Sequence, residues 1–112
     1  MEVRRYHKGE EGELWRIFYN TVHQINARHY SEAQINAWAP AGLDQQLWSG
    51  KIQDIDPYVV VLEGKIVGYA DLQKSGYIDH FFCHHEHQRK GVGNCLISFI
   101  MAEASRLRGF EA

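Results

Sequence analysis

Apolar positions in the first part of the chain recur every three or four residues. Between residues 10 and 27 they fall at Leu14, Ile17, Phe18, Val22 and Ile25. This spacing is typical of one face of an α-helix, and a short strand over residues 3–6 is expected before it. Ser31-Glu32-Ala33-Gln34 matches a capping box and predicts the start of a second helix, which should end before Pro40.

The period of the pattern changes in the second half of the chain. Residues 58–62 and 66–72 are apolar and rich in β-branched side chains, and a turn at Glu63-Gly64 joins them. A turn at Ser75-Gly76 leads to a third predicted strand over 77–83, and an apolar helical repeat then runs from 96 to 107. Residues 44–49 are expected to form one more helical turn, and the parts of 29–51 outside this turn and the second helix a loop. The predicted fold class is α+β: one domain over residues 1–112, with an antiparallel meander in a mixed sheet flanked by helices.

A glycine-rich segment lies between the third strand and the last helix, at Gln88-Arg89-Lys90-Gly91-Val92-Gly93. The first N–H groups of a helix lack internal partners and carry partial positive charge, and glycine lets the main chain approach a ligand closely. The segment therefore predicts a phosphate site. It is not a P-loop, because Asn94-Cys95 follows Gly93, and it is not a dinucleotide fingerprint, because Leu96 stands where a third small residue is needed.

The Gln-x-x-Gly-x-Gly pattern, with the strand end Phe81–Gln88 before it, closely resembles the pyrophosphate-binding motif of the GCN5-related N-acetyltransferases (GNAT). The element order resembles this family along essentially the whole chain, and the residue-level likeness runs from about 76 to 109. The resemblance implies an acyl-CoA N-acyltransferase-like fold. The alternative is an ordinary glycine-rich turn between a strand and a helix.

The resemblance implies transfer of an acetyl group from acetyl-CoA to a small-molecule or peptide amine by direct attack. Main-chain N–H groups from Arg89 through Asn94 would hold the coenzyme A pyrophosphate, and the end of the strand would pair with the pantetheine arm. The implied cofactor-binding residues are Phe82, Cys83, Gln88, Arg89, Lys90, Gly91, Val92, Gly93 and Asn94. A nucleophilic Cys83 is the alternative, but the family transfers the acyl group directly and nothing here marks a lowered thiol pKa.

Two residues are candidates for the base that takes the proton of the amine, Asp79 and His80. They are adjacent on a predicted strand, so their side chains should face opposite sides. The family often places an acidic residue on this strand, which favours Asp79. Either residue is equally compatible with an ordinary surface or hydrogen-bonded position.

Composition narrows the function classes. A net charge of −2 argues against a nucleic-acid surface, and no apolar run is long enough to span a membrane. The first residues lack the apolar core of a signal peptide, so we expect a cytoplasmic protein with reduced Cys83 and Cys95. His84, His85 and His87 could cluster in the turn, but no cysteine pair or carboxylate completes a zinc set, and no metal is expected.

The family resemblance also suggests a missing C-terminal part. After the motif helix the family continues with further strands, whereas Leu107-Arg108-Gly109 looks like a helix end three residues before the last residue. The family often takes its general acid, a tyrosine, from that region, so no residue is assigned to this role. An exposed edge at 77–83 would invite pairing, so a homodimer is expected. The alternative function is a truncated, non-catalytic module that binds coenzyme A or dimerises.

Overall fold

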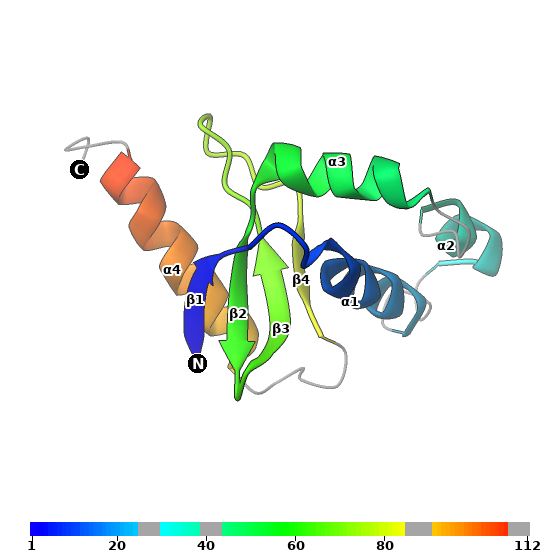
Figure 1. Cartoon of the computed structure of the whole chain (residues 1–112), viewed down its shortest axis with the longest axis horizontal. Coiled ribbons are helices and arrows are strands. Elements are labelled where there is room, and N and C mark those ends of the chain that lie inside the picture. Colours follow the sequence, from blue (N-terminus) through cyan, green and yellow to red (C-terminus); the bar gives the residue numbers. More distant parts are fainter. Residues whose placement is uncertain (25–29, 39–43, 85–90, 108–112) are drawn as a thin grey trace.

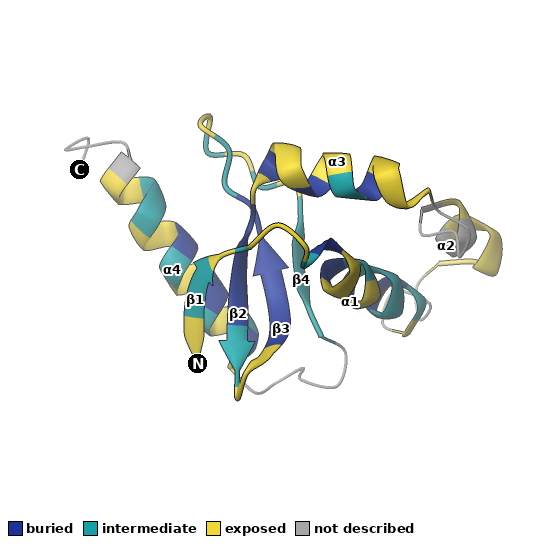
Figure 2. Cartoon of the chain, viewed as in Figure 1, coloured by how far each residue is buried: buried dark blue, intermediate teal, exposed yellow. Residues whose placement is uncertain are grey.

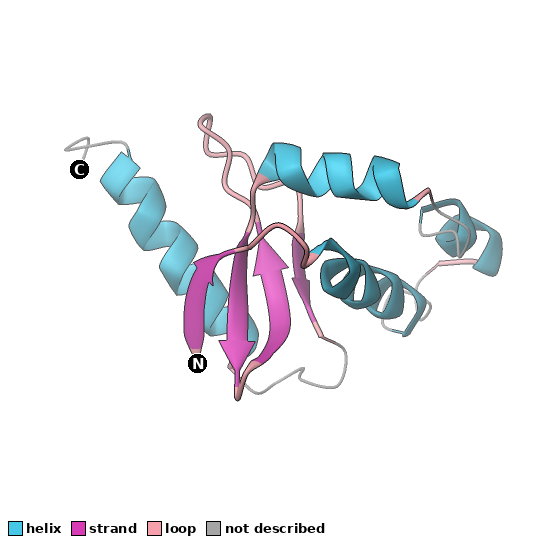
Figure 3. Cartoon of the chain, in the orientation of Figure 1, coloured by secondary structure: helices cyan, strands magenta, loops and turns pink. Residues whose placement is uncertain are grey.

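A four-stranded antiparallel sheet forms the centre of the computed structural model, which describes residues 1–24, 30–38, 44–84 and 91–107. The strand order is β1-β2-β3-β4 (Figure 1). The strands are β1 (Glu2–Arg5), β2 (Tyr58–Leu62), β3 (Lys65–Ala70) and β4 (Phe81–Cys83). The helices are α1 (Glu11–Gln24), α2 (Glu32–Trp38), α3 (Gln45–Ile55) and α4 (Val92–Leu107), as Figure 3 shows by colour. The predicted α+β class is confirmed.

Helices cover both faces of the sheet and create the two main apolar clusters of the described residues. On one face, α1 and α3 bury Leu14, Trp48 and Ile52 against Val59 and Tyr69. On the other face, α4 buries its own apolar stripe, with Leu96 and Ile100, against Val60 and Val67. Figure 2 shows β2 and β3 buried between these helices, which makes the central hairpin the core of the fold.

A β-bulge in β3 changes which side chains face each helix layer. Val60 lies opposite Gly68, while Val61 lies opposite Ile66, so Val67 is an extra residue in the ladder. Strict alternation would place Ile66 and Tyr69 on opposite faces. The bulge instead brings both into the cluster under α1 and α3.

The first two helices begin as their sequences predict. Leu14, Ile17, Thr21 and Val22 form the buried stripe of α1. The main-chain N–H of Ser31 donates to Gln34 Oε1 at 2.9 Å, and the N–H of Gln34 donates to Ser31 Oγ at 3.2 Å. This reciprocal pair is the capping box expected at the start of α2.

The expectation of a single helical turn over 44–49, followed by a loop, is wrong, because α3 runs from Gln45 to Ile55. The side chain of Asp44 caps its first turn by accepting the N–H of Gln46 at 2.8 Å. Trp48, Ile52 and Ile55 are spaced by four and three residues and are all buried. Gly50 lies between Trp48 and Ile52 of this stripe. Burial of the stripe outweighs the cost of one glycine in a helix, which is about 1 kcal/mol relative to alanine.

The predicted strand over 77–83 is shorter than expected, since β4 contains only Phe81–Cys83. The Asp71 N–H still donates to the carbonyl of His80, at 3.2 Å. However, the N–H of His80 and the N–H of Asp79 both donate to Asp71 Oδ1, at 2.6 and 2.9 Å. Asp71 Oδ1 thus takes the His80 N–H, which a continuing ladder would pair with the Asp71 carbonyl, together with the Asp79 N–H, which would point away from β3. The strand ends there.

Candidate functional site

The glycine turn, residues 88–93, is the segment predicted to hold phosphate. The structure describes it from Gly91 onward, whereas Gln88, Arg89 and Lys90 lie outside the described residues. Gly91 has φ of +81°, a conformation that L side chains rarely adopt. The helix α4 begins at the next residue, and the N–H of Cys95 donates to the Gly91 carbonyl at 2.9 Å. The N–H groups of the first turn of α4 therefore have no intrahelical acceptor, as the sequence pattern requires.

The start of α4 packs closely against β3. A Cβ built on Gly68 would lie 3.0 Å from Val92 Cγ1 and 3.2 Å from the Phe82 carbonyl oxygen. A Cβ on Gly93 would lie 3.7 Å from Cys83 Sγ. The absence of a side chain at Gly68 thus sets the depth at which the glycine turn sits beside the end of β4.

The outer edge of β4 follows from the alternation of its ladder with β3. The register pairs Gly68 with Cys83 and Ala70 with Phe81, between the bonded positions at His80 and His84. In an antiparallel ladder bonded and non-bonded pairs alternate, so the polar main-chain groups of Phe81 and Cys83 are directed away from β3. On that side the Thr21 hydroxyl of α1 donates to the Cys83 carbonyl at 2.9 Å.

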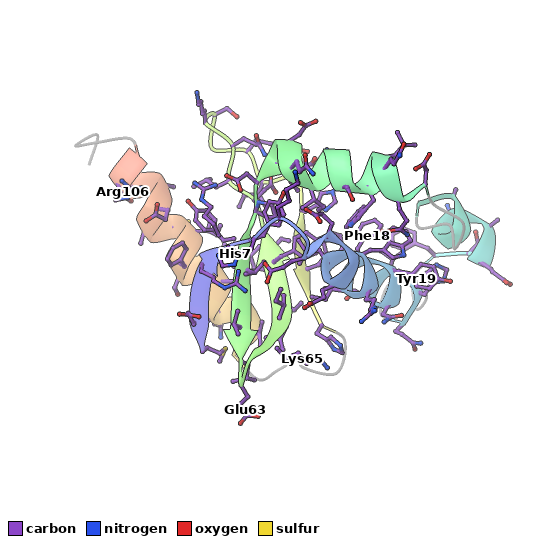
Figure 4. All side chains as sticks on the ribbon, in the orientation of Figure 1. His7, Phe18, Tyr19, Glu63, Lys65 and Arg106 are labelled. Carbon is purple, nitrogen blue, oxygen red and sulfur yellow. The ribbon has the colours of Figure 1, made fainter. Side chains whose placement is uncertain are left out.

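His80 lies in an aromatic environment between α1, α3 and the sheet. Its ring stacks on Phe18 with 5.6 Å between centroids, and its Nδ1 lies 2.9 Å from the Tyr69 hydroxyl. Figure 4 shows Phe18 among the side chains between α1 and α3. Burial is the main cause that lowers the pKa of His80 below its ordinary value of 6.5. Burial also raises the pKa of Tyr69 well above its usual range, so its hydroxyl stays protonated.

Asp79 has a different environment although it is the preceding residue. Its carboxylate forms an ion pair and hydrogen bond with Lys51 of α3, and both side chains are partly exposed. This bond to Lys51 lowers the pKa of Asp79. The structure therefore separates the two predicted base candidates: Asp79 points toward α3 and His80 toward Tyr69.

The Cys83 thiol is not activated as a nucleophile. Burial raises the pKa of Cys83, which makes its thiolate scarce at neutral pH. Within the described ranges no cluster of three or more histidine, cysteine, aspartate or glutamate side chains could hold a metal ion; His85 and His87 of the predicted cluster lie outside these ranges. Over the same residues, no helix has the length and apolar character needed to cross a membrane.

A cavity of about 270 Å³ lies on the α1 face. Its lining includes Arg16 and Asn20 of α1, Lys65 at the start of β3, and His84 after β4. The antiparallel order places the start of β3 and the end of β4 at the same end of the sheet, where Figure 4 shows Lys65. The cavity therefore adjoins the end of the sheet from which the chain leads to the glycine turn.

Several residues that shape the site were not predicted from the sequence. Lys51, Tyr69 and Asp71 contact the two base candidates, and Thr21 contacts the β4 edge. Lys51 was assigned to a loop, and its pairing with Asp79 spans 28 residues of sequence. The only available signal was Asp71 itself, a charged residue at the end of an apolar strand.

Comparisons with known proteins agree on one family. The model of the acetyltransferase (GNAT) domain matches residues 26–110. The uncharacterized N-acetyltransferase YafP of Escherichia coli K12 is 30% identical over 107 residues, which cover 96% of this chain and 69% of YafP. A crystal structure of a GCN5-related N-acetyltransferase from Rhodopseudomonas palustris has a TM-score of 0.88 and 27% identity, covering 96% of this chain and 68% of that one.

A more distant structure shares the fold. The PaiA N-acetyltransferase from Thermoplasma acidophilum, solved in complex with coenzyme A, has a TM-score of 0.74 at 15% identity and covers 94% of this chain and 72% of that one. The glycine turn, the sheet order and these likenesses lead to the same assignment: the chain belongs to the GNAT family of N-acetyltransferases.

Proposed function

We propose that the chain transfers the acetyl group of acetyl-CoA to the nitrogen of a small-molecule or peptide amine, with His80 as the base. The observation that carries this proposal is the glycine turn at the start of α4, beside an edge strand whose main-chain groups at Phe81 and Cys83 are directed outward. Family membership and the coenzyme A complex of PaiA support the choice of co-substrate.

The donor set fits the phosphates of coenzyme A. The N–H groups of Val92, Gly93 and Asn94 belong to the first turn of α4, where the helix dipole favours an anion. A side chain at Gly91 would be strained at its φ of +81°. In this proposal Gln88, Arg89 and Lys90 continue the phosphate site. Phe81 pairs through its main chain with the pantetheine arm, while Cys83, whose carbonyl accepts from Thr21, and Phe82 lie beside that arm.

The reaction needs one proton to leave the amine. The amine nitrogen attacks the thioester carbonyl carbon, a C–N bond forms, the C–S bond breaks, and the leaving thiolate takes up a proton to give an amide and the coenzyme A thiol. We assign Nδ1–H of His80 as the donor to the Tyr69 oxygen, which leaves the lone pair on Nε2 for the proton of the amine. The lowered pKa of His80 keeps this lone pair available at neutral pH. Asp79 is the second candidate base. Its bond to Lys51 lowers its pKa, which makes its carboxylate a weaker base than the His80 imidazole.

Two further expectations belong to this proposal. The chain would act in the cytoplasm, and it would self-associate as a homodimer. The location rests on the sequence pattern and on the family. The homodimer rests on the exposed apolar side chains of α4, Ile97 and Met101.

The test compares two glycines with nearly equal main-chain strain. Gly91 and Gly64 have φ of +81° and +79°, and a Cβ on Gly64 would meet nothing within 4 Å. Alanine at either position should cost a similar 1–2 kcal/mol or so of stability. Only Gly91→Ala should weaken coenzyme A binding in calorimetry, by about tenfold, which corresponds to 1.4 kcal/mol. Equal affinities in the two folded variants would overturn the phosphate site.

Turnover is measured separately. Release of the coenzyme A thiol from acetyl-CoA is followed with aliphatic amines, aromatic amines and peptide N-termini. Amine-dependent release with a matching acetamide product supports the transferase. Coenzyme A binding without release for any amine class would favour the non-catalytic binding module.

A further inference from the structure

Asp71 is a fully buried carboxylate directly after β3, and the proposed chemistry gives it no part. A buried carboxylate is costly unless donors surround it. Asp71 has three: the main-chain N–H groups of Asp79 and His80 on Oδ1, and Gln73 Nε2 on Oδ2. Its carboxylate is thus built into the segment that carries both candidate bases.

The two main-chain donors converge on a single oxygen. Oδ1 lies 2.9 Å from the nitrogen of Asp79 and 2.6 Å from the nitrogen of His80. Two consecutive amides can reach one acceptor only if the chain bends there, so β4 starts after His80. The bend sends the two neighbouring side chains to different partners, Asp79 to Lys51 and His80 to Tyr69.

We propose that Asp71 is a positioning residue for acetyl transfer: its carboxylate fixes the main chain at Asp79–His80 and so holds the His80 imidazole against the Tyr69 hydroxyl. The inference rests on the proposed function, because the held imidazole is the proposed base. Without this carboxylate the His80 ring should leave its place between Phe18 and Tyr69, and the tautomer set by the Tyr69 contact should be lost.

Loss of the Asp71 charge and release of the His80 ring should change the pKa of His80 in opposite directions, which makes the proposal testable. The charged and titratable groups that face its ring are Asp71, Asp79, Lys51 and Tyr69. The negative charge of Asp71 raises the pKa of His80, whereas burial of the ring lowers it more strongly. Removing the charge alone should lower the pKa, and releasing the ring to water should raise it toward 6.5.

The experiment compares Asp71→Asn, Asp71→Ala and the control Gln73→Ala by ¹⁵N NMR of the His80 ring. In Asp71→Asn the oxygen can still accept both amides, and the Gln73 amide can turn its own oxygen toward the new NH₂ group. We expect Asn to keep the wild-type tautomer with an equal or lower pKa, and Ala to lose the tautomer preference with a higher pKa. Gln73→Ala removes the donor on Oδ2 and should lower stability, but it leaves Oδ1 and its two amides in place, so His80 should keep the wild-type tautomer.

Kinetics with any amine that the wild type acetylates gives a second readout. A displacement of about 1 Å can cost on the order of a hundredfold in rate. We therefore expect Asp71→Ala to lose about ten- to a hundredfold in kcat, with the affinity for acetyl-CoA unchanged and with kcat largely kept in Asp71→Asn. A purely structural role would lower the melting temperature but leave the pH profile and the kcat of the folded enzyme unchanged.

The outcomes separate this inference from the proposed function. If the wild type shows no amine-dependent thiol release, the proposed function fails, while the NMR titration still decides whether Asp71 positions the ring. If a folded Asp71→Ala keeps the wild-type tautomer and pKa, the positioning role is overturned. Should that variant not fold, hydrogen exchange in the wild type decides: the amides of Asp79 and His80 must be protected far more than that of Ile78.

Discussion

His80 and Asp79 are neighbours with opposite electrostatic environments, and these environments rank them as bases. We expect His80→Gln to lower kcat by about a hundred- to ten-thousandfold, the usual range for loss of a general base. Asp79→Asn should lower kcat far less, because the carboxylate already shares its charge with Lys51. Both variants should bind coenzyme A with wild-type affinity in calorimetry. A larger loss in Asp79→Asn than in His80→Gln would reverse the assignment.

The pH dependence follows from the direction of the His80 shift. Burial lowers its pKa, so the acid limb of kcat/KM should have its midpoint below 6.5. Unfolding exposes the ring and raises its pKa, so the unfolded chain binds more protons between the two values. This part of the stability is therefore complete above pH 6.5 and is lost as the pH falls through the folded pKa. Kinetic profiles and thermal melts between pH 5 and pH 8 check both statements, and an acid limb centred at or above 6.5 would contradict them.

Asp79 and His80 could be named as candidate bases from the sequence, and their roles in catalysis stay predictions. Asp79 and His80 stood out because polar residues interrupt an apolar run. Their order depends on Lys51 and Tyr69, which approach only in the folded chain. The contact of Phe82 with the cofactor stays a prediction; in the ladder its main-chain groups face β3, whereas those of Phe81 and Cys83 are directed outward.

Gly68 of β3 determines how closely the start of α4 packs against the sheet. A methyl group there would come within 3.2 Å of a main-chain oxygen and 3.0 Å of Val92. We expect Gly68→Ala to cost about 1–3 kcal/mol, as overpacking does, and to weaken coenzyme A binding by displacing the start of α4. Denaturant melts and calorimetry measure the two effects.

Gly12→Ala is the matched control for Gly68→Ala. Gly12 lies in α1, and a Cβ there would meet nothing within 4 Å. Alanine favours the helix by up to about 1 kcal/mol over glycine, so this variant should be at least as stable as the wild type. A folded Gly68→Ala protein with unchanged stability would mean that the sheet yields at the bulge.

At the scale of elements, long periodic segments were predictable and elements with mixed signals were not. The capping box at Ser31 and the hairpin at Glu63-Gly64 were correct because local chemistry alone decides them. Helix α3 was underestimated because Gly50, a residue of low helix propensity, lies between Trp48 and Ile52 of its apolar stripe. Strand β4 was overestimated because no local signal shows that the Asp71 side chain takes the amides of the next strand.

For the whole molecule, the expected self-association has a defined surface. Ile97 and Met101 lie four residues apart on α4 and are 38% and 63% exposed, and β4 is an edge strand of the described sheet. We expect light scattering at micromolar concentration to give twice the monomer mass. Met101→Lys should shift the equilibrium toward the monomer, while Leu47→Lys, at an equally exposed site on α3, should not. A monomer at all concentrations would contradict the prediction.

The family could be predicted from residues 88–93 because these residues meet the general requirements for binding a phosphate. Two glycines at a strand-to-helix junction, followed by an apolar helix, meet the requirements of a phosphate site. The arrangement of the sheet follows less directly, since β1 pairs with β2 only after three helices of intervening chain. Such long-range pairing has no signal within either strand.

The separation of β1 from β2 also sets an order of folding. The hairpin of β2 and β3 closes through a tight turn, whereas Arg5 reaches Asp56 across 51 residues. Closing the longer loop loses more chain entropy before any contact is gained, so we expect β1 to join after the transition state. Val3→Ala should then speed unfolding and leave the folding rate nearly unchanged, whereas Val67→Ala in the hairpin should slow folding. Thermal fluctuations of the native protein should accordingly release β1 first, while the sheet that carries the acetyl-transfer site stays intact.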